Sequence, residues 1–457
     1  MRNHRYTARR GGHRAVVWVF VLFSALFLTN CTERLTDPIG PQTEQKSTLG
    51  KTAVNGQLFE SNNFYSVPLD GWPGTNITWG GDLVVYAHGY YAPADLPWTP
   101  GSDKVDGTPI SGIVNSLGFA YASTSYRSQG LVVPEAVEDI VILVNGFTAK
   151  NNGRKPTHVY LVGPSEGGVV TTLAIEKYPG VFSGGMAMCG PIGDFRKQMD
   201  YLGDFHLLFS YFFPAVVPGD PRGIPDVGNP PAPITLDEWN NTYRPSIEYA
   251  VANNASPTRQ LLSVSRASID LGDPTSVPKT VVDILWYNLF ATNDAITRLN
   301  GFPFNNKSPY RWYFGSNNDL RLNLTIPRLS ATPAAVARMN NEFQTSGRLG
   351  LPLVTLHTTG DPIIPYWHAT QYLAKTILSG SGLRHTHIPI LRYGHCNFKV
   401  YEVLAGFAVL VLKVTARDLI VTTKALPSIE EQNQLRELAG KHGARPKLPR
   451  EIAQIQR

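Results

Sequence analysis

The sequence predicts an α/β fold with a mostly parallel sheet, helices on both faces and a large inserted helical cap. Short apolar runs typical of buried strands alternate with helical segments in two blocks, about 54–194 and 346–418. Such alternation indicates parallel strands joined by helices. The region 195–345 between the blocks breaks this rhythm and is rich in Pro, Asn and aromatic residues. Because it falls between two strands, we expect it to be an insertion, the cap.

The individual elements follow from run length and from the residues that bound each run. Strands are expected at Leu83–Ala87, Gly118–Ser123, His158–Val162, Phe182–Met188, Leu353–His357 and Thr386–Leu391. Helices are expected at Pro134–Val144, Glu166–Tyr178, Trp367–Ser379 and Val400–Ala416, and within the cap at Leu202–Phe213 and Thr280–Phe290. Asn145-Gly146 is predicted to stop the first of these helices.

The N-terminus indicates export. Residues 1–30 hold five arginines and no acidic residue, and they include the apolar run Ala15–Leu28. That run is short for crossing about 30 Å of hydrocarbon but suits a signal peptide. Leu28-Thr29-Asn30-Cys31 resembles a bacterial lipobox, so residues 1–31 are predicted to be a signal segment. Three alternatives stay open: lipidation of Cys31 with membrane anchoring at the cell envelope, secretion without lipid after cleavage nearby, or an uncleaved anchor.

Charge and composition limit the remaining classes. The net charge is +6, but without the five N-terminal arginines the chain has 36 basic residues (41 − 5) against 35 acidic ones. No basic face is indicated, so a nucleic-acid partner is not expected. Residues 32–53 are polar and are predicted to be a linker, and residues 419–457 are predicted to be a charged C-terminal tail, either a peripheral helix or disordered.

One motif places a serine on the turn between a strand and a helix. Residues 163–167 read Gly-Pro-Ser-Glu-Gly, a G-x-S-x-G pattern, directly after the strand His158–Val162. In this setting the turn is sharp: Gly163 and Gly167 let neighbouring backbone approach, and the hydroxyl of Ser165 stands above the sheet. The Glu166 amide begins the helix and would point at developing negative charge.

A nucleophilic serine needs a base, and the base needs an acid that orients it. The chain order serine, acid, histidine belongs with this type of turn. Asp361 follows one predicted strand and His395 follows the next. The C-terminal ends of parallel strands share one edge of a sheet, so Ser165, Asp361 and His395 are expected to meet there.

Both partners of the serine have alternatives. The chain contains 11 histidines. His368, at a helix start, is a lesser candidate for the base, and three other histidines are expected to pack in or beside strands: His357, His385 and His387. Asp194 follows the strand beside that of the serine and is the rival acid. Asp361 is preferred because Gly-Asp-x-x-Ile-Pro before a helix is the usual arrangement.

Together these residues resemble the α/β-hydrolase superfamily, over about residues 54–194 and 346–418. The resemblance implies the α/β-hydrolase fold. It also implies that His88-Gly89 shapes a loop in which the amide of Tyr90 joins that of Glu166 as an oxyanion hole. The His88 side chain would support this loop.

The cysteines add a second, narrower resemblance. The chain has three, Cys31, Cys189 and Cys396. Gly-His-Cys at 394–396 is similar to the tannase and feruloyl esterase group, in which a Cys beside the histidine bonds to one beside the serine. Here Pro164 stands beside the serine, and Cys189 ends the next strand. The resemblance therefore suggests a Cys189–Cys396 disulfide, with two buried free cysteines as the alternative.

Aromatic residues of the cap allow two interpretations. The stretch Tyr201–Phe213 holds six aromatic rings in 13 residues. It would form either the core of the cap or an aromatic pocket over Ser165 for an acyl or aryl group. Two further pairs allow the same two interpretations: Trp286 with Tyr287, and Trp312 with Tyr313.

We therefore expect a monomeric serine hydrolase that cleaves small-molecule carboxylic esters through an acyl-enzyme. No cofactor or metal is expected, because no zinc-site spacing and no phosphate-binding loop occur. A peptidase of the prolyl-oligopeptidase type is one alternative. That family usually carries a β-propeller ahead of the hydrolase domain, whereas only about 30 residues separate the predicted linker from the first predicted strand. A non-catalytic surface-binding protein on the same scaffold is another, although such proteins commonly lose a triad residue.

Overall fold

The computed structural model describes residues 50–54, 57–68, 78–93, 97–217 and 234–449. The predicted signal segment, Cys31 and most of the predicted linker lie outside these ranges. The linker is predicted to extend to residue 53, but the strand β1 (Gly50–Val54) already begins at Gly50. It pairs antiparallel with β2 (Gln57–Ser61), so strand pairing sets in a few residues earlier than the polar composition indicated.

Seven strands form one sheet in the order β11-β10-β9-β8-β4-β7-β3. The strands are β3 (Asn63–Ser66), β4 (Leu83–Tyr86), β7 (Ala120–Thr124), β8 (Val159–Pro164), β9 (Gly184–Met188), β10 (Leu353–Gly360) and β11 (His385–Tyr393). All neighbours in the sheet are parallel except β3 and β7, which are antiparallel. A short hairpin of β5 (Lys104–Val105) and β6 (Thr108–Pro109) stands apart from this sheet.

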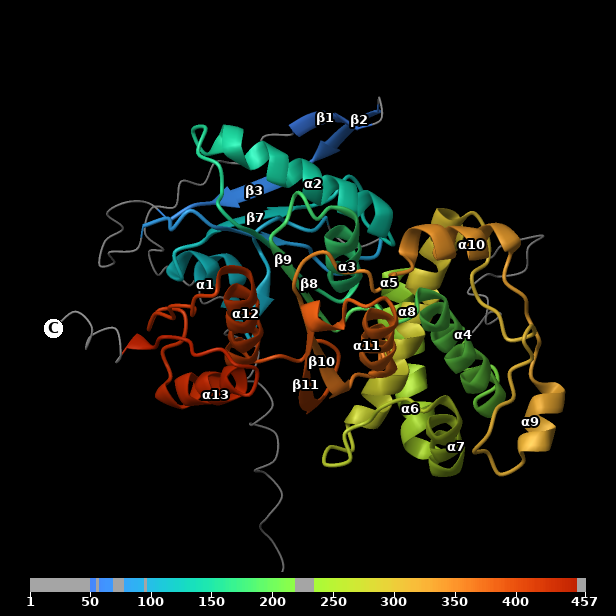
Figure 1. The fold of residues 1–457 in the computed structure, drawn as a ribbon. Coiled ribbons are helices and arrows are strands. Elements are labelled where there is room, and N and C mark those ends of the chain that lie inside the picture. Colours follow the sequence, from blue (N-terminus) through green and yellow to red (C-terminus); the bar gives the residue numbers. More distant parts are fainter. Residues whose placement is uncertain (1–49, 55–56, 69–77, 94–96, 218–233, 450–457) are drawn as a thin grey trace, which may run out of the picture. The chain divides into compact units, whose positions relative to one another are not determined.

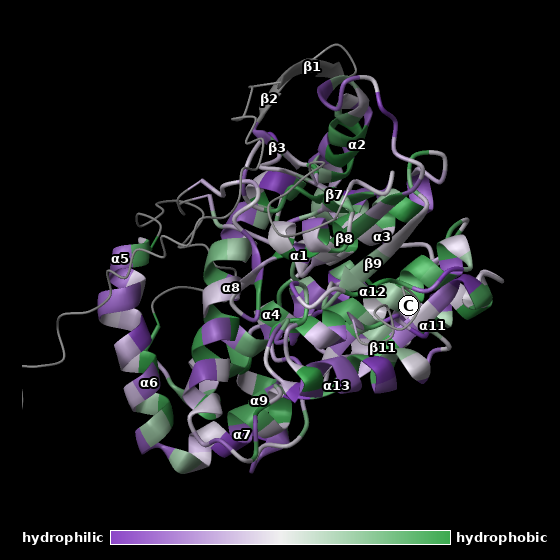
Figure 2. Ribbon diagram, turned by 90° about the vertical axis from the view of Figure 1, so that its left-hand side faces the viewer, coloured by the Kyte–Doolittle hydropathy of each residue, from purple (hydrophilic) through white to green (hydrophobic). Residues whose placement is uncertain are grey.

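Helices cover both faces of the sheet (Figure 1). One face carries α2 (Val133–Lys150), α3 (Glu166–Lys177) and α11 (Trp367–Leu378); the other carries α1 (Ile110–Ser116), α12 (Val400–Thr415) and α13 (Ile429–Gly440). Successive residues of a strand point to opposite faces, so Val85 packs with the first group of helices and Val84 with the second. Figure 2 shows α3 and α12 largely in the hydrophobic colour, as helices that bury much of their surface should be. The predicted α/β-hydrolase fold, with the serine turn after the central strand β8, is confirmed.

The stop predicted for the first helix at Asn145-Gly146 is wrong, since α2 continues to Lys150. Phe147 is fully buried and packs against Tyr65 and Trp79, with ring centroids 6.0 and 5.9 Å apart. Gly146 lies under the Tyr65 hydroxyl, which would stand 3.1 Å from an added Cβ. Burial of Phe147 thus outweighs the low helix propensity of the two residues before it.

The region between β9 and β10 is more helical than its sequence suggested. It contains α4 (Phe195–Phe212), α5 (Leu236–Glu238), α6 (Arg244–Asn253), α7 (Ala255–Ser265), α8 (Ser276–Leu299), α9 (Asp319–Thr325) and α10 (Pro333–Arg338), with single turns η1 (Trp239–Tyr243) and η2 (Met339–Phe343). The rings of Phe205, Phe209 and Phe213 are buried with α7 and α8 in one apolar cluster. The aromatic stretch of α4 therefore forms the core of the cap.

The C-terminal tail is less peripheral than its charge indicated. After η3 (Gly382–Arg384), β11 and α12, the chain forms α13, in which Leu435 and Ala439 are fully buried against α12. These two residues are one helical turn apart and give α13 a single apolar side. Within the described part of the chain, no helix combines the length and apolar character needed to cross a membrane.

Truncation of Phe147 to Ala should lower the free energy of unfolding by roughly 3–5 kcal/mol, because it leaves a cavity where α2 meets β3. Urea unfolding followed by circular dichroism measures this loss. The exposed Leu378→Ala on α11 should change it by less than about 0.5 kcal/mol. Equal effects of the two substitutions would show that α2 does not need this anchor.

Candidate active site

The serine turn is strained and firmly held. Ser165 has φ 55° and ψ −124°, a backbone conformation that non-glycine residues rarely adopt. Its amide donates to the Met188 carbonyl at 2.9 Å, and its carbonyl accepts from the Gly168 amide at 2.9 Å. A Cβ on Gly167 would collide with the Ala87 carbonyl, so only glycine fits there. The neighbouring strands β4 and β9 thus fix the turn that presents the serine hydroxyl.

The structure brings together the three residues that the sequence selected. His395 Nε2 lies 2.9 Å from Ser165 Oγ, and His395 Nδ1 lies 2.8 Å from Asp361 Oδ2. Ser165 follows β8, Asp361 follows β10 and His395 follows β11, so all three lie at C-terminal strand ends. An imidazole between a hydroxyl and a carboxylate can accept the hydroxyl proton while the carboxylate stabilises the resulting charge.

The carboxylate of Asp361 is completely buried, yet both oxygens have partners. Oδ1 accepts from the amides of Ile363 and Ile364 at 2.9 and 3.0 Å, and Oδ2 faces His395. His357 Nε2 also lies 3.6 Å from Oδ2, while it bonds the Ile364 carbonyl at 2.8 Å. His357, predicted as a packing residue, is buried and borders the acid directly.

Helix α4 of the cap holds the loop that carries Asp361. Gln198 Nε2 donates to the Ile363 carbonyl at 2.9 Å, and the Tyr201 hydroxyl donates to the Pro362 carbonyl at 2.7 Å. Ile363 itself is buried in the apolar core of the cap. The sequence reasoning missed the positioning roles of Gln198 and Tyr201, because no local pattern signals a contact more than 160 residues away.

Helix α8 of the cap holds the loop that carries His395. The Tyr393 hydroxyl lies 2.7 Å from Thr280 Oγ1 and also donates to the Ser276 carbonyl at 3.3 Å. Both partners belong to the first turns of α8. The two loops that carry Asp361 and His395 are therefore each tied to a different cap helix.

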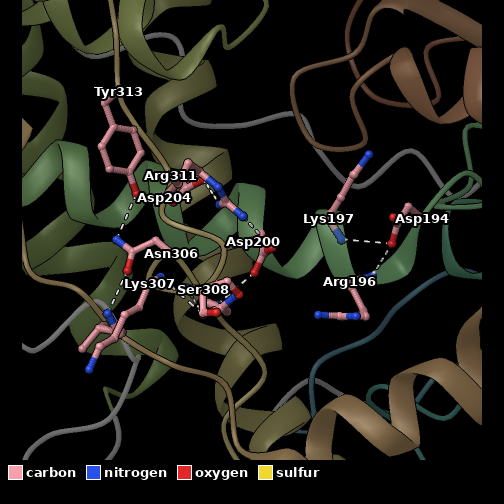
Figure 3. A network of polar contacts seen from close by, with 12 residues as sticks. Asp194, Arg196, Lys197, Asp200, Asp204, Asn306, Lys307, Ser308, Arg311 and Tyr313 are labelled. Atoms are coloured by element: carbon pink, nitrogen blue, oxygen red, sulfur yellow. Dashed lines mark hydrogen bonds and ion pairs between the residues drawn. The ribbon is translucent and has the colours of Figure 1, made fainter.

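The alternative acid and base have other roles. Asp194 caps α4, where its Oδ1 accepts from the amides of Arg196 and Lys197 at 3.1 and 3.3 Å (Figure 3). His368 is fully buried, and its Nδ1 accepts from the Gly193 amide at 3.0 Å. Burial lowers the pKa of His368 well below its usual range, so this ring is neutral and holds the start of the cap. The two remaining histidines predicted to pack beside strands, His385 and His387, both form hydrogen bonds with the hydroxyl of Thr355 in β10.

The loop of His88-Gly89 lies against the serine turn. A Cβ on Gly89 would stand 3.4 Å from that of Ser165. The His88 ring is stacked between Trp98 and Tyr126, with centroids 4.2 and 4.0 Å away. Burial lowers the pKa of His88 to about 4, so near neutral pH Nδ1–H donates to the Gly89 carbonyl at 2.7 Å. The His88 side chain thus supports the loop that leads to Tyr90.

Cys189 and Cys396 are joined by a disulfide, with Cα atoms 5.5 Å apart. The bond connects the end of β9 to the residue after His395, across 207 residues of sequence. Among the described residues, His395 and these two cysteines are the one group with a metal-ligand composition. Because the two sulfurs bond each other, they offer no thiolate to a metal.

Aromatic side chains of α8 line the site from the cap. The Tyr287 ring lies 6.3 Å from that of His395 and 6.3 Å from that of Tyr90. Trp286 packs on Tyr90 at 6.3 Å and on Tyr287 at 4.9 Å. Of the two aromatic pairs that allow two interpretations, Trp286 and Tyr287 therefore lie beside Tyr90, and Tyr287 also lies beside His395. In the other pair, Trp312 is exposed and Tyr313 is buried in the cap.

The side chain of Glu166, next to the serine, is buried. Its Oε1 accepts from the Val132 amide at 2.9 Å, which ties the start of α3 to the start of α2. Burial raises the pKa of this carboxyl from 4.5 to about 8, a rise that the Val132 hydrogen bond only partly offsets. The carboxyl is therefore largely protonated at neutral pH and adds little negative charge beside the serine.

Comparison with known proteins gives similarity in fold only. The chain matches no known family profile, and no curated protein matches its sequence. An esterase from Aspergillus oryzae is 14% identical over 76% of this chain and 72% of its own, with a TM-score of 0.41. A Pyrococcus furiosus esterase is 10% identical over 83% of this chain and 92% of its own, also at 0.41.

An acylaminoacyl peptidase solved with a chloromethyl ketone is 12% identical over 83% of this chain, with a TM-score of 0.39. This chain spans only 42% of that peptidase. At such low sequence identities and TM-scores, these similarities say nothing about the reaction. Any inference about the reaction therefore comes from the geometry of the site.

The raised pKa of Glu166 makes a prediction about stability. Between about pH 4.5 and pH 8 the folded protein keeps a proton that the unfolded chain has released. The contribution of Glu166 is therefore most favourable below pH 4.5 and declines as the pH rises toward 8, by about 1.4 kcal/mol per pH unit in that window. In Glu166→Gln, which cannot ionise at this position, the free energy of unfolding should decline less steeply between pH 4.5 and pH 8.

Urea unfolding at several pH values, with wild type and Glu166→Gln compared at each, measures the effect. Glu430→Gln, on the exposed start of α13, serves as the matched control and should leave the pH dependence unchanged. Parallel pH curves for wild type and Glu166→Gln would contradict the buried, protonated state of this carboxyl.

Proposed function

We propose that this protein is a serine hydrolase that cleaves carboxylic esters through an acyl-enzyme intermediate. The observation that carries the proposal is the continuous chain from Ser165 Oγ through His395 to Asp361, with contacts of 2.9 and 2.8 Å. A strained turn presents the hydroxyl, and a buried carboxylate orients the base. This combination fits nucleophilic catalysis better than ligand binding.

In the proposed mechanism, His395 Nε2 takes the proton from Ser165 Oγ as the oxygen attacks the acyl carbon. Asp361 holds the Nδ1–H tautomer and stabilises the imidazolium. The ester's alcohol leaves with the proton from Nε2, so Ser165 carries the acyl group. Water then attacks this acyl-enzyme with His395 again as base, which releases the acid and restores the serine hydroxyl.

The backbone amides of Tyr90 and Glu166 are proposed to bind the developing oxyanion. Glu166 is the first residue of α3, where backbone N–H groups lack intrahelical acceptors and the helix dipole favours negative charge. Gly89 brings the Tyr90 loop against Ser165. The protonated state of Glu166 supports this role, because a carboxylate there would oppose the oxyanion.

An ester is proposed over a peptide because of what surrounds the base. Tyr287 and Trp286 face His395 and Tyr90 with aromatic surfaces, which suit an apolar acyl or aryl group. Export, with or without lipid at Cys31, stays part of the proposal. The Cys189–Cys396 disulfide supports it, because disulfides persist mainly in oxidising compartments.

A fluorophosphonate probe tests the nucleophile. Wild-type protein should be labelled, and Ser165→Ala should lose labelling completely together with its hydrolysis of p-nitrophenyl esters. Retained ester hydrolysis in Ser165→Ala would overturn the proposal, and so would a folded wild type that neither labels nor hydrolyses. A parallel panel of aminoacyl anilides distinguishes the classes: faster cleavage of anilides than of matched esters would make the protein a peptidase.

Two aspartates make a matched test of the acid. Asp361→Asn should lower kcat by roughly 10⁴-fold, because an amide favours the wrong tautomer of the histidine. Asp194→Asn should change kcat by less than about threefold, because Asn also caps helices well. Steady-state hydrolysis of one p-nitrophenyl ester by both variants measures the difference. A larger loss of kcat in Asp194→Asn than in Asp361→Asn would show that Asp194, and not Asp361, is the acid.

A further inference from the structure

The cap displays a row of exposed aromatic side chains. In the segment 310–314, Tyr310, Trp312 and Phe314 are 53%, 41% and 60% exposed, whereas Arg311 and Tyr313 between them turn inward. The ring centroids of neighbouring exposed residues are 6.2 Å apart in both pairs. We call Tyr310, Trp312 and Phe314 the aromatic strip.

A partly buried polar network holds the residues between the exposed rings (Figure 3). Arg311 pairs with Asp200 at 2.6 Å and also with Asp204, both on α4. The Tyr313 hydroxyl donates to Asp204 at 2.5 Å and accepts from Asn306 at 3.0 Å. Because the inward residues are held in this way, the outward rings are presented in a fixed row and pay little ordering entropy on binding.

Exposed leucines extend the strip along α9. Leu320 and Leu324 are 60% and 74% exposed and lie one helical turn apart on one side of this helix. Asn323 joins α9 to the strip: its Oδ1 accepts from the Tyr313 amide at 2.9 Å, and its carbonyl accepts from the Tyr310 hydroxyl at 3.1 Å. Of 14 exposed large hydrophobic side chains in the described ranges, five belong to this one stretch.

The segment that carries the strip is rich in basic residues. Residues 307–328 contain four basic residues and one acidic residue. Asp319 is turned to the backbone, where it accepts from the amides of Gly315 and Ser316. Of the basic residues, Arg311 is neutralised by its aspartates and Arg328 lies over the Tyr310 ring, 3.9 Å from its centroid, whereas Lys307 and Arg321 are exposed. The segment that carries the aromatic strip therefore has an excess of positive charge.

We propose that the aromatic strip, with Leu320 and Leu324, binds the interface of an anionic phospholipid bilayer. Aromatic rings and leucines beside lysine and arginine are the composition of segments that rest at the headgroup level of a membrane. A polysaccharide would stack on the rings but would leave the leucines of α9 unused. A second copy of the chain paired through a two-fold axis would bring two segments of the same positive charge together.

Quenching by brominated lipid tests the contact at Trp312 directly. The full-length chain is mixed with vesicles of phosphatidylglycerol and brominated phosphatidylcholine, and tryptophan fluorescence is recorded for wild type and Trp312→Phe. The chain has eight tryptophans, and the difference between the two proteins isolates the one on the strip. We expect bromolipid quenching of this difference signal, weakened by high salt. Its absence would overturn the proposal, even if the N-terminal segment binds the vesicles.

A matched pair of double variants separates this surface from apolar exposure in general. Leu320→Ser with Leu324→Ser should reduce quenching of the Trp312 signal and require about 10-fold more lipid for half-saturation. Ile377→Ser with Leu378→Ser, equally exposed on α11 at 62% and 87%, should leave both unchanged. Equal losses in the two double variants would overturn the proposal. So would strip-dependent dimerisation or cellulose binding without any quenching.

Discussion

The site depends on one buried carboxyl group, that of Asp361. Burying such a group is costly unless its oxygens are hydrogen-bonded, and here two backbone amides and the histidine are its partners. The loop after β10 must therefore keep the tight turn that presents the amides of Ile363 and Ile364. With that turn formed, Oδ2 of Asp361 lies 2.8 Å from Nδ1 of His395, whose other nitrogen faces the serine.

The cap is as much a part of this arrangement as the sheet. Helix α4 holds the carbonyls of the acid loop through Gln198 and Tyr201, and α8 holds the histidine loop through Thr280. The same helix α8 also places Tyr287 beside His395, with ring centroids 6.3 Å apart. A substitution that shifts either helix should thus alter both the contacts among Ser165, His395 and Asp361 and the aromatic side chains next to them.

The sequence predicted six of the seven sheet strands, the cap's position and the three residues that meet, because each is signalled locally: strands by short apolar runs, and Ser165, Asp361 and His395 by their place after strands. It missed the antiparallel edge strand β3, which is short and only partly buried. What it could not supply is long-range. The helix stop predicted at Asn145-Gly146 does not occur, because Phe147 is buried against Tyr65 and Trp79, which lie outside the helix. Composition likewise could not tell which aromatic cluster of the cap would reach the site.

The Cys189–Cys396 bond has a consequence for the chain as a whole. Every described residue of the cap lies between its two ends, which are 207 positions apart. Closing such a long loop lowers the conformational entropy of the unfolded chain, which would stabilise the folded protein by on the order of 5 kcal/mol. A protease that cuts once within the cap therefore yields two fragments that stay covalently joined. Such a nicked protein would keep serine and histidine in one molecule and would come apart on a gel only after reduction.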